Sequence, residues 1–92
     1  MALPRRVHVV VSGHVQGVFF RTTCAREAKA RGVAGWIRNR DDGSVEAAFE
    51  GGADVVAAMI SWCRRGPSGA SVTDIDARDE APTGERGFRV MG

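Results

Sequence analysis

The sequence predicts a two-layer α/β sandwich in which two helices cover one face of a mostly antiparallel sheet. Its 92 residues, 43% hydrophobic and 26% charged, have the length and composition of one soluble domain spanning residues 1–92. The hydrophobic period changes along the chain in the order strand, helix, strand, strand, helix, strand, and a short fifth strand follows. This order matches the split βαβ arrangement of ferredoxin-like folds and leaves the exact strand order open.

The first strand and the first helix flank a loop that contains glycine. Residues 5–12, RRVHVVVS, are rich in β-branched side chains, which is typical of a strand. Its residues expected on one face are Val7, Val9 and Val11. After a loop over residues 13–20, good helix formers predict a helix over about residues 21–31, ended by Gly32. The apolar positions at helical spacing are Phe20, Cys24, Ala25 and Ala28.

A hairpin is expected next. Residues 33–40, VAGWIRNR, predict a short strand, and the DDG sequence between Arg40 and Ser44 is typical of a tight turn. Residues 44–51, SVEAAFEG, predict the antiparallel partner strand. Its alternating apolar residues are Val45, Ala47 and Phe49. We expect Trp36 to be partly buried in the core beside the first of these strands.

The second helix and two further strands complete the chain. Residues 53–66 predict a helix with an early Asp54, late arginines and a closing Gly66. Its apolar face comprises Val56, Met59, Ile60 and Cys63, and Trp62 is expected at the border of that face. Residues 71–81 alternate and predict a strand. Its residues expected on one face are Thr73, Ile75 and Ala77. Residues 87–91 predict a short strand at the edge of the sheet.

Charge and cysteine content narrow the range of functions. The net charge of +2 favours small anions and lacks the clustered basic residues of a nucleic-acid-binding protein. Lys29 is the single lysine among the thirteen positive side chains, and arginine is suited to bidentate phosphate binding. No stretch has the features of a signal sequence or a membrane span, so we expect a cytoplasmic protein without membrane partners. We also expect a monomer that does not bind nucleic acid. Cys24 and Cys63 are expected to be buried free thiols, and the sequence does not decide whether they interact.

The loop GHVQGVFFR, residues 13–21, is the candidate binding site. It lies between a strand and a helix start, where free backbone N–H groups and the helix dipole attract anions. Gly13 and Gly17 allow the backbone to curl around a phosphate-sized group, and Arg21 can add a charge-assisted contact. The apolar side chains of the loop are expected to brace it or enter the core: Val15, Val18, Phe19 and Phe20.

Asn39 is expected to reach the same site. It ends the strand that follows the first helix, and a right-handed βαβ crossover makes that strand parallel to the first. The C-terminal ends of the two strands then lie at one edge of the sheet, so the Asn39 amide can approach the loop. The oxygen of an amide can accept a hydrogen bond from a water molecule, and its N–H groups can donate to an oxygen that gains negative charge.

These residues resemble the acylphosphatase family, whose signature has the form G-x-V-Q-G-V-x-[FY]-R and then G-[FYW]-x-x-N-x-x-x-G-x-V-x-x-x-x-x-G. The first motif matches Gly13, Val15, Gln16, Gly17, Val18, Phe20 and Arg21. The second matches Gly35, Trp36, Asn39, Gly43, Val45 and Gly51. The resemblance spans nearly the whole chain. Ile37 departs from the Ala, Val or Cys usual in the family, which is a conservative change.

The resemblance implies hydrolysis of the carboxyl–phosphate bond of acyl phosphates, with inorganic phosphate as product and inhibitor. It implies catalysis by Arg21, which holds the phosphate, and by Asn39, which orients the attacking water. The implied phosphate-binding residues are Val15, Gln16, Gly17, Val18, Phe19, Phe20 and Arg21. No metal or cofactor is implied.

Two other functions remain open from the sequence. One is a non-catalytic binding module, because ferredoxin-like sheets also serve as RNA-binding or regulatory domains, although no strand carries the aromatic pattern of an RNA-recognition sheet. The other is a domain of a larger carbamoyl-handling maturation protein, and the length of 92 residues favours the stand-alone enzyme over it.

Overall fold

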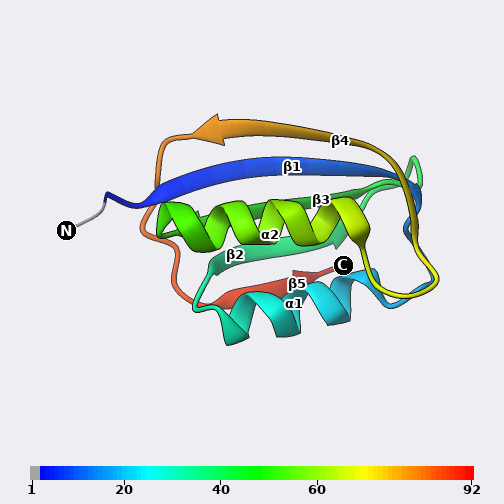
Figure 1. Cartoon of the computed structure of the whole chain (residues 1–92), viewed down its shortest axis with the longest axis horizontal. Helices are drawn as coiled ribbons and strands as arrows, with labels where there is room; N and C mark the ends of the chain where they lie inside the picture. Colours follow the sequence, from blue (N-terminus) through cyan, green and yellow to red (C-terminus); the bar gives the residue numbers. More distant parts are fainter. Residues whose placement is uncertain (1–2) are drawn as a thin grey trace.

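The computed structural model describes residues 3–92, and it confirms the predicted fold class (Figure 1). Residues 1 and 2 of the predicted domain lie outside the described residues. The elements are β1 (Arg5–His14), α1 (Phe20–Ala30), β2 (Ala34–Asn39), β3 (Val45–Gly51), α2 (Ala53–Arg65), β4 (Ser71–Glu80) and β5 (Phe88–Met91). Both helices cover the same face of the sheet, as Figure 1 shows.

The sheet has the strand order β4-β1-β3-β2-β5. Strand β3 pairs antiparallel with both β1 and β2, which makes β1 and β2 parallel to each other on either side of it. Strand β4 pairs antiparallel with β1, and β5 pairs parallel with β2. The predicted position of the last strand at an edge is confirmed, and the C-terminal ends of β1 and β2 point the same way.

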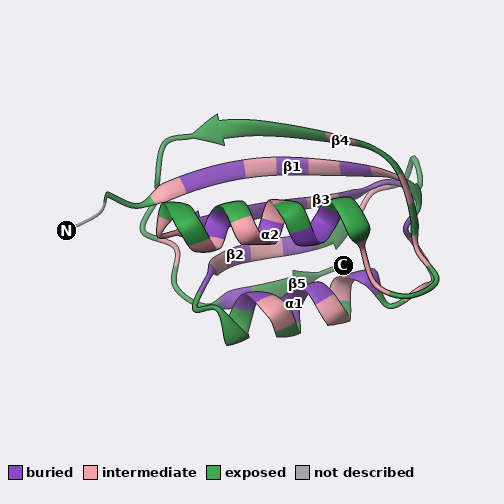
Figure 2. Cartoon of the chain, viewed as in Figure 1, coloured by how far each residue is buried: buried purple, intermediate pink, exposed green. Residues whose placement is uncertain are grey.

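The core lies between the helices and the sheet. The inward-facing residues of β1 and β3 are buried as predicted, with Val9, Val11, Val45 and Phe49 at 0% exposure. Figure 2 shows this buried band along β1 and β3 and the exposed outer strand β4. The fold thus buries one face of the central strands, which holds their ends in fixed positions.

The two tryptophans differ from expectation. Trp62 is a core residue rather than a border residue, because it is buried and its ring packs edge-on against Phe20 at 5.3 Å between centroids. Trp36 is half-buried, but it lies outside the core on the face of the sheet opposite to the helices. There it pairs with Ala48, and its ring lies 6.2 Å from that of His8. Alternation explains this placement, since the neighbouring Ile37 faces the helices.

A register shift between β1 and β4 corrects two predictions. The pairing runs from Ser12↔Asp74 to Gly13↔Val72, so Thr73 is an extra residue in the ladder. Val72 therefore packs against the core instead of Thr73. Of the residues expected to face inward, Thr73, Ile75 and Ala77, only Ile75 is half-buried. The shift also extends β1 to His14, two residues beyond the predicted end.

The two cysteines are buried and free, as expected. The two thiols lie close enough to interact between α1 and α2, which answers the question that the sequence left open. Hydrogen bonding to Cys63 and burial raise the pKa of the Cys24 thiol well above its usual value. We infer that these thiols pack as small apolar groups.

Candidate active site

A cavity of about 340 Å³ lies between the β1–α1 loop and the end of β2. It is lined by Val15, Gln16, Gly17, Phe19, Phe20, Arg21, Thr22 and Asn39. The structure therefore brings together all the predicted site residues except Val18, which packs half-buried against the core. The lining contains no carboxylate, so no side chain that lines the cavity repels an anion.

Two residues of the loop have the left-handed backbone conformation that occurs in anion nests. Gly17 has a φ of 76°, and Phe19, which precedes α1, has φ 60° and ψ 28°. Left-handed residues that alternate with right-handed ones turn successive N–H groups toward one centre, where an anion can accept from several of them. Glycine adopts this conformation freely, whereas Phe19 adopts it at a cost of roughly 1 kcal/mol.

Phe19 does not brace the loop or enter the core, contrary to expectation. Its ring is 80% exposed, whereas Phe20 is buried against Trp62. The left-handed backbone at Phe19 turns its side chain outward, and Phe20 occupies the core instead. Val15 and Val18 do behave as predicted, since Val15 is buried and Val18 packs on the core.

The first turn of α1 supplies further free donors. The first hydrogen bond of the helix runs from Thr23 N to Phe19 O at 3.0 Å. The N–H groups of Phe20, Arg21 and Thr22 therefore have no carbonyl partner within the helix. The helix also lacks a side-chain N-cap and has no acidic residue in its first turn. Its positive dipole end is thus available to an anion at the cavity.

Arg21 brings a full positive charge to this cavity. Its Nη1 donates to the backbone oxygen of Met91 at 3.3 Å, which ties the guanidinium to the end of β5. It forms no ion pair with any carboxylate in the part of the chain that the structure describes. Its charge therefore remains available to a ligand, and β5 restricts where that charge lies.

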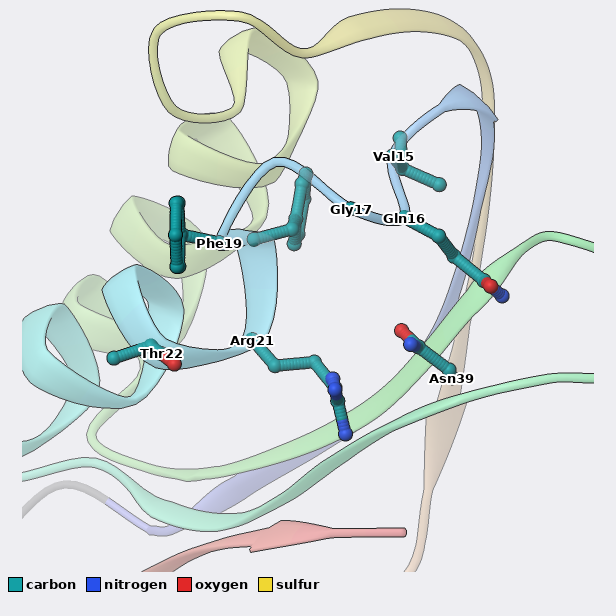
Figure 3. A pocket seen from close by; sticks show the side chains of 8 residues that line it. Val15, Gln16, Gly17, Phe19, Arg21, Thr22 and Asn39 are labelled. Carbon is teal, nitrogen blue, oxygen red and sulfur yellow. The ribbon is translucent and has the colours of Figure 1, made fainter.

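Asn39 approaches the loop from the other side. It is the last residue of β2, opposite Val45 of β3. Figure 3 shows the Arg21 and Asn39 side chains pointing toward one another beneath the loop, whereas Phe19 and Thr22 point away from this pair. The parallel arrangement of β1 and β2 produces this approach, as the sequence predicted. A positive charge and a neutral amide thus face one cavity.

The side chain of Gln16 is hydrogen-bonded to a distant part of the chain. Its Nε2 donates to the backbone oxygens of Arg40 at 2.8 Å and of Ser44 at 3.0 Å, both in the turn between β2 and β3. Both amide protons are therefore engaged by the protein. The side chain is not free to bind an anion, and its backbone N–H is the group that can do so.

The turn that receives Gln16 is itself well ordered by hydrogen bonds. Asp42 Oδ1 accepts from the backbone N–H of Ser44 at 3.0 Å and from its hydroxyl at 2.5 Å. The hydroxyl and then the amide of Ser44 lower the pKa of Asp42. Arg40 N donates to Ser44 O at 2.8 Å and closes the turn. The residue next to Asn39 is thus held in a stiff segment.

Sequence reasoning missed two contributors to the cavity. Thr22 lines it, and the free N–H groups expected in the first turn of any helix could have indicated this position. Met91 holds Arg21 through its backbone oxygen, and no sequence signal could have found it, because the contact depends on β5 lying beside β2.

Residues 3–92 contain neither a candidate membrane-spanning helix nor a candidate cluster of metal ligands. No helix there is both long enough and apolar enough to cross a bilayer. Over the same residues, no three His, Cys, Asp or Glu side chains gather as potential metal ligands.

Comparison with known proteins agrees with the geometry. The Acylphosphatase family profile matches residues 7–90. An acylphosphatase of Roseiflexus sp. (strain RS-1) is 53% identical over 87 residues, which covers 94% of this chain and 94% of that protein. The crystal structure of an acylphosphatase from Bacillus subtilis superposes with a TM-score of 0.92 at 34% identity, over 96% of this chain and 99% of that chain.

A larger protein contains a similar domain. The structure of HypF from T. kodakarensis matches 96% of this chain at 28% identity with a TM-score of 0.82, but this covers only 12% of the HypF chain. The match to Roseiflexus acylphosphatase covers nearly all of both proteins. From the family profile and this relative, the chain belongs to the acylphosphatase family.

Proposed function

We propose that this protein hydrolyses acyl phosphates to a carboxylate and inorganic phosphate. The observation that carries the proposal is the single cavity in which the loop, the start of α1, Arg21 and Asn39 meet. The resemblance of the chain to acylphosphatases over nearly its full length supports the same reaction.

The proposed mechanism relies on placement and charge. The backbone N–H groups of residues 15–21 and the Arg21 guanidinium hold the phosphoryl oxygens, and Asn39 orients a water molecule for in-line attack on phosphorus. The bond from phosphorus to the acyl oxygen breaks, its electron pair leaves with the carboxylate, and the water protons pass to phosphate and solvent. A carboxylate is a good leaving group, so the reaction needs no strong general acid.

The direct test is turnover of acetyl phosphate and benzoyl phosphate by the purified protein in excess chelator. We expect hydrolysis of both at a rate that the chelator does not change, with inorganic phosphate as a competitive inhibitor. Failure to hydrolyse either substrate, with the fold intact by circular dichroism, would overturn the proposal. Hydrolysis that the chelator abolishes would overturn its metal independence.

We further propose that the protein acts as a monomer in the cytoplasm. Every group assigned to the reaction comes from one chain, which supports activity without a second subunit. Two neighbouring free thiols also suit a reducing compartment. Activity that disappears with dilution, together with a dimer in sedimentation, would contradict the proposal that the protein acts as a monomer.

A further inference from the structure

We propose that Gln16 is a positioning residue, which holds the phosphate-binding loop at the distance from Asn39 that the attacking water requires. The inference rests on the proposed function. It differs from the role that the resemblance implies for Gln16, because it assigns the side chain to the protein and leaves only the backbone N–H for phosphate.

The first support is the use of both amide protons. Nε2 donates to Arg40 O at 2.8 Å and to Ser44 O at 3.0 Å. The opposite orientation of the amide would place its oxygen against two carbonyl oxygens, so the two acceptors define which way the amide faces. The same two carbonyls also accept backbone bonds, from Gly43 N at 3.2 Å and from Arg40 N at 2.8 Å.

The second support is where these bonds lie in the fold. The acceptors Arg40 and Ser44 are the ends of the β2–β3 turn, and Asn39 directly precedes the first of them. In the part of the chain described, these are the only hydrogen bonds between loop residues 15–19 and turn residues 40–44. The turn is stiffened by Asp42 and Ser44, so fixing its ends also fixes Asn39.

The consequence for catalysis follows from the separate origins of the two catalytic groups. The phosphoryl group is held by the loop and Arg21, whereas the water is oriented by the end of β2. Because in-line attack depends on the relative placement of both, an error of about 1 Å can lower the rate on the order of 100-fold. Phosphate affinity does not depend on that placement.

The test uses Gln16→Met and Gln16→Glu. Methionine has similar length without donors, and the glutamate carboxylate would face two carbonyl oxygens. We expect kcat for benzoyl phosphate to fall about 10-fold or more, with the larger loss in Gln16→Glu. The inhibition constant of inorganic phosphate should change less than about twofold in Gln16→Met, because the backbone donors and Arg21 remain.

The matched control is Val55→Ala. Val55 is half-buried and packs against the core near Gly51, at the opposite end of the sheet from the loop. It should lower the urea midpoint of unfolding while leaving kcat unchanged. This control separates a loss of stability from a loss of positioning.

A double mutant identifies the path of the effect. Because Gln16 is proposed to act through Asn39, Gln16→Met should cost little further rate in an Asn39→Ala background. Normal kcat in Gln16→Met, equal losses of kcat and phosphate affinity, or full additivity with Asn39→Ala would each overturn the inference. If wild-type protein hydrolyses no acyl phosphate, the proposed function fails. The contact between Gln16 and the β2–β3 turn is then judged from the amide resonances of residues 39–44, which should shift in Gln16→Met and stay unchanged in Val55→Ala.

Discussion

At the scale of single residues, Phe19 shows how the loop departs from ordinary backbone preferences. A non-glycine residue with φ 60° is uncommon, and strain of this kind collects at functional sites. Its exposed ring gains little from burial, so the side chain does not explain the conformation. The left-handed conformation suits the proposed binding of phosphate by the backbone N–H groups of the loop.

Arg21 and Asn39 should respond differently to truncation. Arg21 contacts phosphate charge in the ground state and in the transition state, so Arg21→Ala should lose phosphate affinity and rate together. Asn39 orients water, so Asn39→Ala should lose rate with little change in phosphate inhibition. Steady-state kinetics with phosphate as competitor measures both. Equal weakening of phosphate inhibition in the two variants would contradict this division of roles.

At the scale of elements, the β4–β5 connection is held by one buried carboxylate. Glu50, at 6% exposure, accepts from the backbone N–H groups of Thr83 at 2.9 Å and Gly84 at 2.8 Å. It also pairs with Arg6 at 3.1 Å. Since β5 follows this connection and its Met91 oxygen holds Arg21, Glu50 supports the element that reaches the cavity.

Replacement of Glu50 by glutamine should show how much the charge of this carboxylate stabilises the fold. Burial alone would raise the pKa of Glu50, but the bonds from Thr83, Arg6 and Gly84 outweigh it and lower the pKa below the ordinary value of 4.5. A carboxylate whose pKa is lowered in the folded state stabilises the fold at pH values above its ordinary pKa. This stabilisation is lost as the pH falls through the pKa of the folded state. Glu50→Gln should therefore cost about 3 kcal/mol of unfolding free energy at pH 7, and progressively less below about pH 4.5.

Urea unfolding across this pH range measures the effect. The control is Asp79→Asn, since Asp79 pairs with Arg5 on the surface with its side chain 73% exposed. Exposed pairs contribute at most about 1 kcal/mol, so this variant should differ little from wild type. A cost for Glu50→Gln that stays constant from pH 7 to pH 3 would show that its charge is not the stabilising feature.

At the scale of the whole molecule, the site joins segments from three parts of the chain: the loop, the end of β2 and the end of β5. Phosphate binding should therefore stabilise the folded state as a unit, because the unfolded chain has no such site. At about 100 times its dissociation constant, phosphate should add about 2.7 kcal/mol and raise Tm by roughly 10–20 °C. Differential scanning calorimetry measures this shift, which should be much smaller in Arg21→Ala; an equal shift in that variant would indicate binding elsewhere.

The sequence by itself determined the seven elements and the character of the loop. Alternation in residues 5–12 and helical spacing in residues 53–66 are local patterns, because each lies within one short segment of the chain. The glycines and Arg21 beside a helix start are local signals of the same kind. The approach of Asn39 was also predictable, because the handedness of a βαβ crossover restricts where its strand ends. The roles of these residues in catalysis stay predictions.

Only the tertiary structure decided the strand order and the partners of individual side chains. Gln16 meets a carbonyl 24 residues away, and Arg21 meets one 70 residues away. The shift at Gly13 needs β4 as a neighbour, and the outward turn of Phe19 leaves the core position to Phe20, which packs on Trp62 of α2. Local patterns carry no information on such contacts, because each depends on how distant segments pack once the common core has formed.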